Sequence, residues 1–253
     1  APYCGMTVTK SLNLTTDLGP CSDNGLEVGA SGAYVNCNGH TITGTGTDNN
    51  TGQGVTMDSH SNITISNCKV DGFVDAFFVR NATGVRLDQN VAMEGNVGIA
   101  LKDVANVILT RNMATNNSAD GIFLENTTNT AIDNNTSIGN GETGYFVGGS
   151  TNASLTKDTA AGNSYGYFIS NSTDNRLYVN NATNNFNEGF HFFGFTSSTL
   201  EQNTAKDNAI GGFYFSFAYN NTVSNNTSVG SKNGFYLDNS SGNDMKGNKA
   251  ICL

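Results

Sequence analysis

The chain has 253 residues, of which 37% are hydrophobic, and it carries a net charge of −9 at pH 7 with 12 Lys and Arg residues. So few cations in an acidic chain exclude the basic surface that nucleic-acid-binding proteins use. The chain also contains no apolar run as long as a membrane span. We therefore expect neither a nucleic acid partner nor a membrane span.

Residues 1–60 contain strand signals at irregular spacing. Residues 6–15 alternate between apolar and polar side chains, which is typical of a strand. Further apolar positions follow at residues 26–28 and at Val35. Residues 43–53 are rich in Gly, Thr and Asn and predict an exposed loop. We expect residues 1–60 to form irregular first coils that continue into the regular part of the chain.

Residues 61–253 repeat with a period of 22 or 23 residues. In each repeat an apolar residue stands three positions before asparagine or a close substitute. The apolar positions are Ile65, Leu87, Leu109, Ile132, Leu155, Tyr178, Leu200, Val223 and Met245. Their partners are Cys68, Asn90, Asn112, Asn135, Asp158, Asn181, Asn203, Asn226 and Asn248. A fixed period of this length predicts a solenoid of stacked coils.

A second column has a small residue followed by three mostly apolar ones. It begins at Gly54, Ala76, Gly98, Gly121, Gly144, Gly166, Gly189, Gly212 and Gly234. A third column of small residues, five positions after the first, suggests a tight inner corner. Coils of about 22 residues with two or three short strands predict an all-β parallel β-helix of about ten coils. We interpret residues 1–253 as one domain.

The asparagine column has a mechanical reason. Asparagine tolerates the left-handed backbone conformation, and stacked asparagines can hydrogen-bond from coil to coil through their amides. We expect this ladder to be structural.

The chain has five cysteines without metal-site spacing. Cys4 and Cys21 flank the first predicted strand, and Cys37 and Cys68 fall within one residue of the same register on adjacent coils. Two disulfides near the N-terminus are the expected result in an oxidising compartment. The odd Cys252 is either a buried thiol or a contact to another chain. We expect no metal site and no cofactor.

Fifteen asparagines stand in Asn-X-Ser/Thr sequons. Three of them, Asn135, Asn181 and Asn226, belong to the ladder and are expected to be too buried for modification. The other twelve are Asn13, Asn49, Asn62, Asn81, Asn116, Asn126, Asn134, Asn152, Asn171, Asn220, Asn225 and Asn239. They are either N-glycan acceptors of a secreted protein or a by-product of turn-rich repeats.

Two segments, Cys37-Asn38-Gly39-His40-Thr41-Ile42 and residues 62–68, resemble the opening coils of right-handed parallel β-helix repeat proteins. This group includes NosD-like and pectate-lyase-like chains of secreted archaeal or bacterial type. The resemblance implies a right-handed β-helix and an extracellular or cell-surface location. It implies little about chemistry, because this fold carries lyases, hydrolases, adhesins and structural proteins.

Enzymes of this group cleave polysaccharides with clustered acids. Asp88 and Asp133 occupy outward positions two coils apart, about 9.6 Å by strand spacing. This separation is at the wide limit for an inverting pair of carboxylates, and the pattern shows no neighbouring Arg, His or second acid. We therefore assign no catalytic residue.

The second strand of each coil predicts an aromatic surface. If the residues beside the middle position point inward, as at Ile122 and Leu124, then the middle residues point outward. These are Phe123, Phe146, Phe168, His191, Tyr214 and Tyr236. Such a row could stack sugar rings or pack against another copy of the chain. The inverted parity would place the aromatic residues inside.

The leading hypothesis is a secreted, glycosylated structural subunit that associates with itself into a filament or surface layer. The contacts would be the aromatic row and the last coil, with Ile251 and Cys252, where the sequence shows no polar cap. The alternative is a cell-surface carbohydrate-binding or adhesive β-helix with a polysaccharide as partner. A polysaccharide lyase or hydrolase is the third hypothesis.

Overall fold

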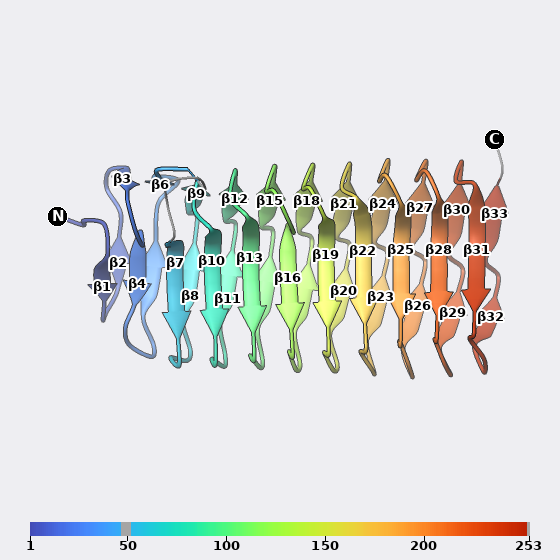
Figure 1. Ribbon diagram of the computed structural model, residues 1–253. Helices are drawn as coiled ribbons and strands as arrows, with labels where there is room; N and C mark the ends of the chain where they lie inside the picture. Colours follow the sequence, from blue (N-terminus) through green and yellow to red (C-terminus); the bar gives the residue numbers. More distant parts are fainter. Residues whose placement is uncertain (47–51, 252–253) are drawn as a thin grey trace.

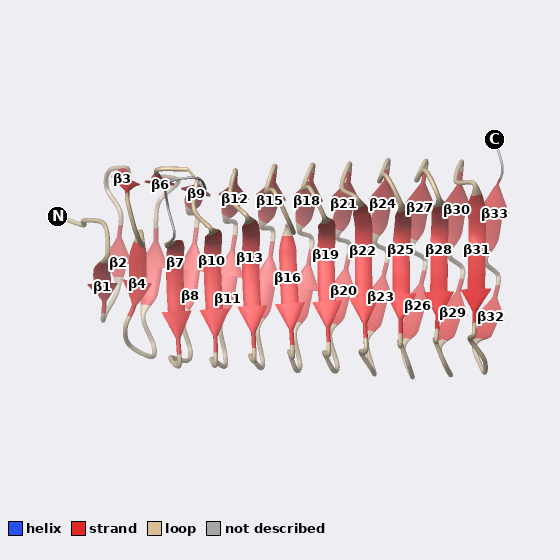
Figure 2. Cartoon of the chain, viewed as in Figure 1, coloured by secondary structure: helices blue, strands red, loops and turns tan. Residues whose placement is uncertain are grey.

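The computed structural model describes residues 1–46 and 52–251, and two predicted residues, Asn49 and Cys252, lie outside this part. The described chain has 33 short strands and no helix, and it winds into a rod of stacked coils (Figures 1 and 2). Every strand pairs in parallel with the strands of the coils beside it, in three sheets of eleven strands. The prediction of an all-β parallel β-helix is confirmed.

Sheet A contains the second-strand column of the sequence and has the longest strands. These are β1 (Met6–Val8), β4 (Leu26–Val28), β7 (Gln53–Asp58), β10 (Asp75–Arg80), β13 (Val97–Lys102), β16 (Ile122–Glu125), β19 (Thr143–Gly148), β22 (Tyr165–Ser170), β25 (Glu188–Phe193), β28 (Gly211–Ser216) and β31 (Asn233–Asp238).

Sheet B contains the apolar position of the asparagine column. Its strands are β2 (Leu12–Asn13), β5 (Tyr34–Asn36), β8 (Thr64–Ser66), β11 (Arg86–Asp88), β14 (Ile108–Thr110), β17 (Ala131–Asp133), β20 (Ser154–Thr156), β23 (Arg176–Tyr178), β26 (Thr199–Glu201), β29 (Thr222–Ser224) and β32 (Asp244–Lys246).

The expected tight corner was wrong, because the column of small residues forms a third strand in each coil, and these strands make up sheet C. The strands are β3 (Leu18–Cys21), β6 (Thr41–Gly44), β9 (Lys69–Asp71), β12 (Val91–Met93), β15 (Met113–Thr115), β18 (Thr136–Ile138), β21 (Thr159–Ala161), β24 (Asn181–Thr183), β27 (Thr204–Lys206), β30 (Thr227–Val229) and β33 (Lys249–Ile251). From β9 to β30 the central side chains of these strands are buried.

The first coils depart from the regular pattern. The single strand expected over residues 6–15 is two strands, β1 and β2, which belong to different sheets. The pairing of β3 with β6 contains a register shift. Disulfides join Cys4 to Cys21 and Cys37 to Cys68, with Cα atoms 5.5 and 4.7 Å apart.

In one repeat the predicted register is one residue too late. Leu177, rather than Tyr178, pairs with Leu155 and with Leu200. The ladder residue of this coil is therefore Asn180 instead of Asn181, and it accepts a hydrogen bond from the backbone of Asp158 at 2.9 Å. The error arose because Leu177-Tyr178 and Asn180-Asn181 fit the template equally well in both registers.

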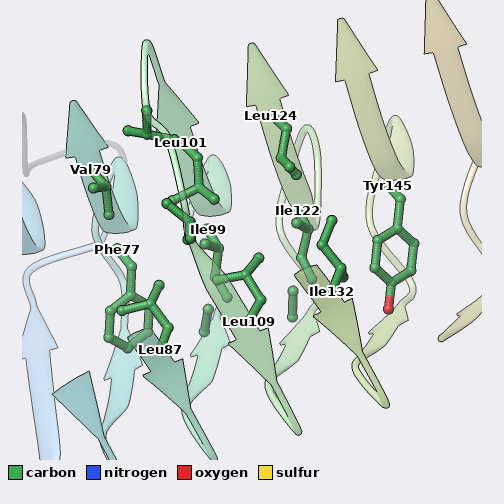
Figure 3. Packing of buried hydrophobic residues seen from close by; sticks show 14 of the residues in the cluster. Phe77, Val79, Leu87, Ile99, Leu101, Leu109, Ile122, Leu124, Ile132 and Tyr145 are labelled. Atoms are coloured by element: carbon green, nitrogen blue, oxygen red, sulfur yellow. The ribbon is translucent and has the colours of Figure 1, made fainter. Parts of the chain in front are cut away.

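The core is a continuous column of apolar side chains along the rod. Ile122 and Leu124 are fully buried, so the predicted parity of sheet A is confirmed. Figure 3 shows these residues with Ile99, Leu101 and Tyr145 in the space between the sheets. Further along, buried aromatic rings stack coil upon coil at centroid distances of 4.6–4.8 Å. They are Tyr145, Tyr167, Phe190, Phe213 and, partly buried, Phe235.

The asparagine ladder lies between sheets B and C. In a typical step the side-chain amide oxygen of Asn203 accepts hydrogen bonds from both nitrogens of Asn180, at 2.9 and 3.0 Å. A second ladder, which the sequence analysis missed, lies between sheets C and A. Its members are Asn117, Asn140, Asn163, Asn185 and Asn208. These amides satisfy the backbone groups that the turns would otherwise leave unpaired inside the rod.

Candidate functional site

Six aromatic side chains form a row on the outer face of sheet A, here called the aromatic stripe. They come from consecutive strands, β16 to β31, and neighbouring ring centroids are 4.6–5.9 Å apart. The stripe consists of Phe123, Phe146, Phe168, His191, Tyr214 and Tyr236, as the sequence predicted. The first five rings are partly buried by one another, and Tyr236 is 49% exposed.

The parallel register of sheet A creates the stripe. Each middle residue is aligned with the middle residues of the coils above and below, so their side chains stack in one column at the strand spacing of about 4.8 Å. Ala100 occupies the next position before Phe123 and ends the continuous row there. The ammonium group of Lys102 lies over the free face of Phe123, 5.2 Å from the ring centroid.

A cavity of about 350 Å³ opens beside the first half of the stripe. Three stripe rings form one wall, and residues at the beginning of the sheet A strands form the other. The lining residues are Asp120, Phe123, Glu142, Thr143, Phe146, Ser164, Tyr165 and Phe168. The site thus combines flat apolar surfaces with two carboxyl groups, which is the composition of a ligand pocket.

The two carboxyl groups of the cavity differ in environment. Asp120 is 7% exposed, and its Oδ1 accepts a hydrogen bond from the backbone nitrogen of Thr143 at 2.9 Å. Burial, with a smaller contribution from the charge of Glu142, raises the pKa of Asp120 to about 6 against the lowering effect of the hydrogen bonds from Thr143. Glu142 itself is exposed. Chemically, a carboxyl that holds its proton in weak acid beside a second carboxylate could bind a cation or act as an acid–base pair.

The acidic side of the stripe continues along the rod. Glu188 lies beside His191, with its carboxylate oxygen 3.5 Å from Nδ1, an ion-pair distance that is long for a hydrogen bond. The ring of Tyr165 stands edge-on to both Phe168 and His191, at 5.5 and 5.6 Å. A smaller hollow of about 100 Å³ follows, and Glu188 also lines it.

The acids that the sequence analysis weighed for catalysis lie elsewhere. Asp88 and Asp133 are on the outer face of sheet B, aligned with Thr110 between them. Contrary to the expectation of no neighbouring cation, Asp88 is bound by Arg111 at 2.7 Å and lies 3.6 Å from Arg86. Burial raises the pKa of Asp88, but the hydrogen bonds from Arg111 and Thr110 and the charges of the two arginines outweigh it and lower the pKa overall.

The carboxyl groups beside the stripe were missed. Asp120 and Glu188 directly precede the glycine of the second column, and Glu142 stands two positions before Gly144. Their column also contains Gln, Val, Thr and Tyr, so it has no uniform residue type. Aligning the residues before these glycines in the register of the aromatic column would have placed the acids beside the aromatic residues.

The predicted glycan acceptors in the described chain lie on the surface, and most of them occupy turns. All eleven described members of the predicted set are exposed, and all except Asn13 have positive φ values. Asn135 and Asn226 are buried as expected. Asn181 is exposed, so its exclusion was wrong and followed from the misplaced register. Turn chemistry therefore accounts for the positions, and exposure makes them accessible to glycosylation.

Glycosylation is tested by intact mass. Expressed in a glycosylating secretory host, the chain should exceed its 26.6 kDa polypeptide mass by several glycans. Asn81, Asn126, Asn171 and Asn239 follow sheet A strands, at the end opposite to Asp120, so glycans there would leave the cavity open. Peptide mapping should find Asn181 occupied more often than Asn135. Protein from such a host with the bare mass would leave the sequons as turn residues.

Within residues 1–46 and 52–251, no three His, Cys, Asp or Glu side chains lie close enough together to hold a metal ion. In the same residues, no helix has the length and apolarity needed to cross a membrane. Of the residues predicted for end contacts, Ile251 is 47% exposed.

Comparisons with solved structures show similar folds at low identity. The Dettilon tailspike protein gp208 matches with a TM-score of 0.76 and 18% identity, over 97% of this chain and 60% of its own. An exopolygalacturonase from Thermotoga maritima matches with a TM-score of 0.72 and 8% identity, over 98% and 83%. A mutant of the periplasmic alginate epimerase AlgG matches with a TM-score of 0.64 and 12% identity, over 96% and 76%.

The chain thus spans 60% of the length of the tailspike protein. No curated protein gives a significant match. The family model described as "Periplasmic copper-binding protein (NosD)" matches residues 36–198 and 193–251, which together include most of the repeats. By this match, the chain belongs to the NosD family of parallel β-helix proteins.

Proposed function

We propose that this protein is an extracytoplasmic β-helix that binds a polysaccharide along the aromatic stripe. The observation that carries the proposal is the continuous stack of six rings on consecutive coils, with a 350 Å³ cavity beside three of them. The flat apolar face of a sugar ring can cover an aromatic side chain, and the polar groups beside the rings can orient its hydroxyls.

The arrangement of the stripe along the rod favours an elongated ligand. Stripe residues repeat once per coil, and a second hollow at Glu188, Tyr214 and Tyr236 follows the first along the rod. A chain of sugar rings could therefore contact several coils at once, and weak contacts at each ring would add up along it. The tailspike protein, the exopolygalacturonase and the alginate epimerase share the fold. The names of the last two are those of enzymes that act on uronate polysaccharides.

Copper binding, which the family description names, does not fit the residues present. Protein copper sites use clustered imidazole and sulfur ligands. Here four cysteines are oxidised in disulfides, and no set of three candidate ligands comes together in the described residues. His191 has Glu188 as its acidic neighbour, which gives two donors. We therefore derive no copper chemistry for this chain.

The proposed location rests on two observations. Disulfides persist in oxidising compartments, and the family model is described as periplasmic. We place the protein outside the cytoplasm, in the periplasm or at the cell surface.

Self-association into a filament or layer, the leading hypothesis from the sequence, becomes the second proposal. The stripe could cover itself against another copy, since an aromatic row of this size is a typical protein interface. Hydrolysis of a bound glycan is a third proposal, supported by the raised pKa of Asp120 beside Glu142. New reducing ends released from a bound glycan would reveal that activity.

The binding proposal is tested at Phe146, the central ring of the cavity. Phe146→Ala is expected to weaken oligosaccharide binding by about tenfold or more, because it removes one stacking surface of about 1.5 kcal/mol. Binding of neutral, uronate and amino-sugar oligosaccharides would be measured by calorimetry. Tyr178→Ala, which removes an outward aromatic side chain from sheet B, is the matched control and should leave binding unchanged.

Sedimentation of the same proteins separates the two proposals. Binding predicts a monomer in which Phe146→Ala changes glycan affinity alone. If the wild type binds no oligosaccharide and sediments as an oligomer that Phe146→Ala dissociates, then the stripe is a contact between copies and the binding proposal is wrong.

A further inference from the structure

The charges beside the stripe limit the kind of glycan that can bind there. On the cavity side, the stripe is flanked by the carboxyl groups of Asp120, Glu142 and Glu188. Among the described residues, the cation that contacts a stripe ring is Lys102, which lies at the first ring. It is also 3.9 Å from Glu125 and so has its own acidic neighbour. The open part of the groove is therefore negative.

A negative groove disfavours acidic sugars. A uronate carboxylate at the Phe146 ring would lie in the same cavity as Asp120 and Glu142. Like charges in a partly desolvated site repel strongly, since the effective dielectric constant is lower than that of water. Ligands such as alginate or pectate would thus meet repulsion along the row of rings.

The same cavity is complementary to an ammonium group. Cations bind favourably over the faces of aromatic rings, and the position of Lys102 over Phe123 is an example within the chain itself. At Phe146, the ring faces of the stripe, the ring of Tyr165 and two carboxyl groups line the same open cavity. Asp120 is held in place by the backbone of Thr143 and is nearly buried, so its carboxyl is fixed rather than free in solvent.

We propose that the cavity at Phe146 binds the protonated amino group of a hexosamine, and that the ligand of the stripe is a cationic amino-sugar polymer rather than a polyuronate. The amino group would lie between the carboxyl groups of Asp120 and Glu142, and the sugar ring would cover Phe146. This inference rests on the proposed polysaccharide binding and specifies its ligand class.

The test compares oligosaccharides that differ in charge. Calorimetry at pH 6.5 would use a β-1,4-linked glucosamine hexamer, its fully N-acetylated counterpart and an oligogalacturonate of equal length. The glucosamine hexamer is expected to bind about tenfold tighter than the N-acetylated one, with no binding of the uronate. Glu142→Gln should weaken glucosamine binding by about tenfold and change the affinity for the N-acetylated hexamer less than twofold.

Controls distinguish this inference from simple charge attraction. Glu201→Gln makes the same change on the outer face of sheet B and should leave all affinities unchanged. A tetralysine peptide should bind at least tenfold more weakly than the glucosamine hexamer, because it cannot cover the rings.

Each other outcome has a defined meaning. Equal or tighter binding of the uronate or the N-acetylated hexamer, with loss in Phe146→Ala, would overturn the amino-sugar inference and leave polysaccharide binding intact. Tetralysine binding as tight as that of the hexamer would also overturn it. Failure of every oligosaccharide to bind would reject the proposed function together with the inference.

Discussion

Replacing Asp158 with asparagine is expected to stabilise the protein by up to about 4 kcal/mol at pH 8 and by little at pH 4. Asp158 is the one carboxylate in the described part of the asparagine ladder. Its Oδ1 accepts hydrogen bonds from both nitrogens of Asn135, at 2.7 and 3.0 Å, as an asparagine oxygen would. Its Oδ2 is buried and has no hydrogen-bond partner among the described residues.

The unpaired oxygen occupies the position of an amide that donates elsewhere in the ladder. In the next coil the side-chain nitrogen of Asn180 donates to the carbonyl of Leu155 and to the amide oxygen of Asn203. An ionised Asp158 would present a negative oxygen to such acceptors, whereas a protonated one could donate its proton. Burial, with a smaller contribution from the nearby charge of Asp133, accordingly raises the pKa of Asp158 to about 7.

The sign of the pH dependence follows from this pKa. Below pH 3.8 the carboxyl is protonated in both the folded and the unfolded state, and its contribution to stability is fully present. As the pH rises to about 7, the unfolded state loses its proton first and stability falls. A pKa raised from 3.8 to about 7 corresponds to about 4 kcal/mol, reached above pH 7. Asparagine removes this loss.

Urea unfolding of the wild type and Asp158→Asn at pH 4, 6 and 8 would measure the effect. The difference in unfolding free energy should grow with pH. Asp174→Asn, which makes the same change in an exposed turn, is the control and should show no such trend. A constant difference across this range would mean that Asp158 is ionised in the fold throughout and that its environment has been misread.

Replacing a ladder asparagine with an apolar residue should strongly destabilise the protein. Asn203→Leu keeps a similar volume but removes the acceptor for the backbone and side-chain nitrogens of Asn180. It also removes the donor to the carbonyl of Leu177, at 2.9 Å. Two or three buried polar groups without partners correspond to a loss of about 2–6 kcal/mol in unfolding free energy.

The control is an equal change on the outer surface. Thr156→Leu on β20 replaces a partly exposed residue whose backbone bonds stay intact, and it should alter stability by less than about 0.5 kcal/mol. Urea midpoints of the two variants would be compared at pH 4, where the charge of Asp158 does not contribute. Similar losses in both variants would show that the ladder amides contribute no more than surface residues.

The repeat predicted the fold because residues at the same position of successive coils share one orientation. Once Ile122 and Leu124 were placed inside, the outward position of Phe123 followed from the alternation of a strand. The same reasoning failed for Tyr178, where the sequence allowed two registers one residue apart. Hydrogen bonding between coils selects Asn180, since its amide accepts from Asp158. That partner is known only when the coils are stacked.

The candidate site was harder to predict than the fold. Its rings were found because the column is uniformly aromatic from Phe123 onward. Asp120 and Glu142 belong to different coils and to offset positions, 22 residues apart in the sequence. What makes them a pair is the cavity between neighbouring coils and the burial of Asp120. Both depend on side-chain packing, which a column of mixed residue types does not reveal.

The coil spacing has a consequence for how such a protein can change over evolution. Each coil from β16 to β31 adds one ring to the stripe at a fixed rise of about 4.8 Å, and the row begins directly after Ala100. Duplication or loss of a single coil would therefore lengthen or shorten the stripe by one ring without altering its other contacts. Under the proposed polysaccharide binding, the number of coils that carry a ring would set how many sugar units the stripe can contact.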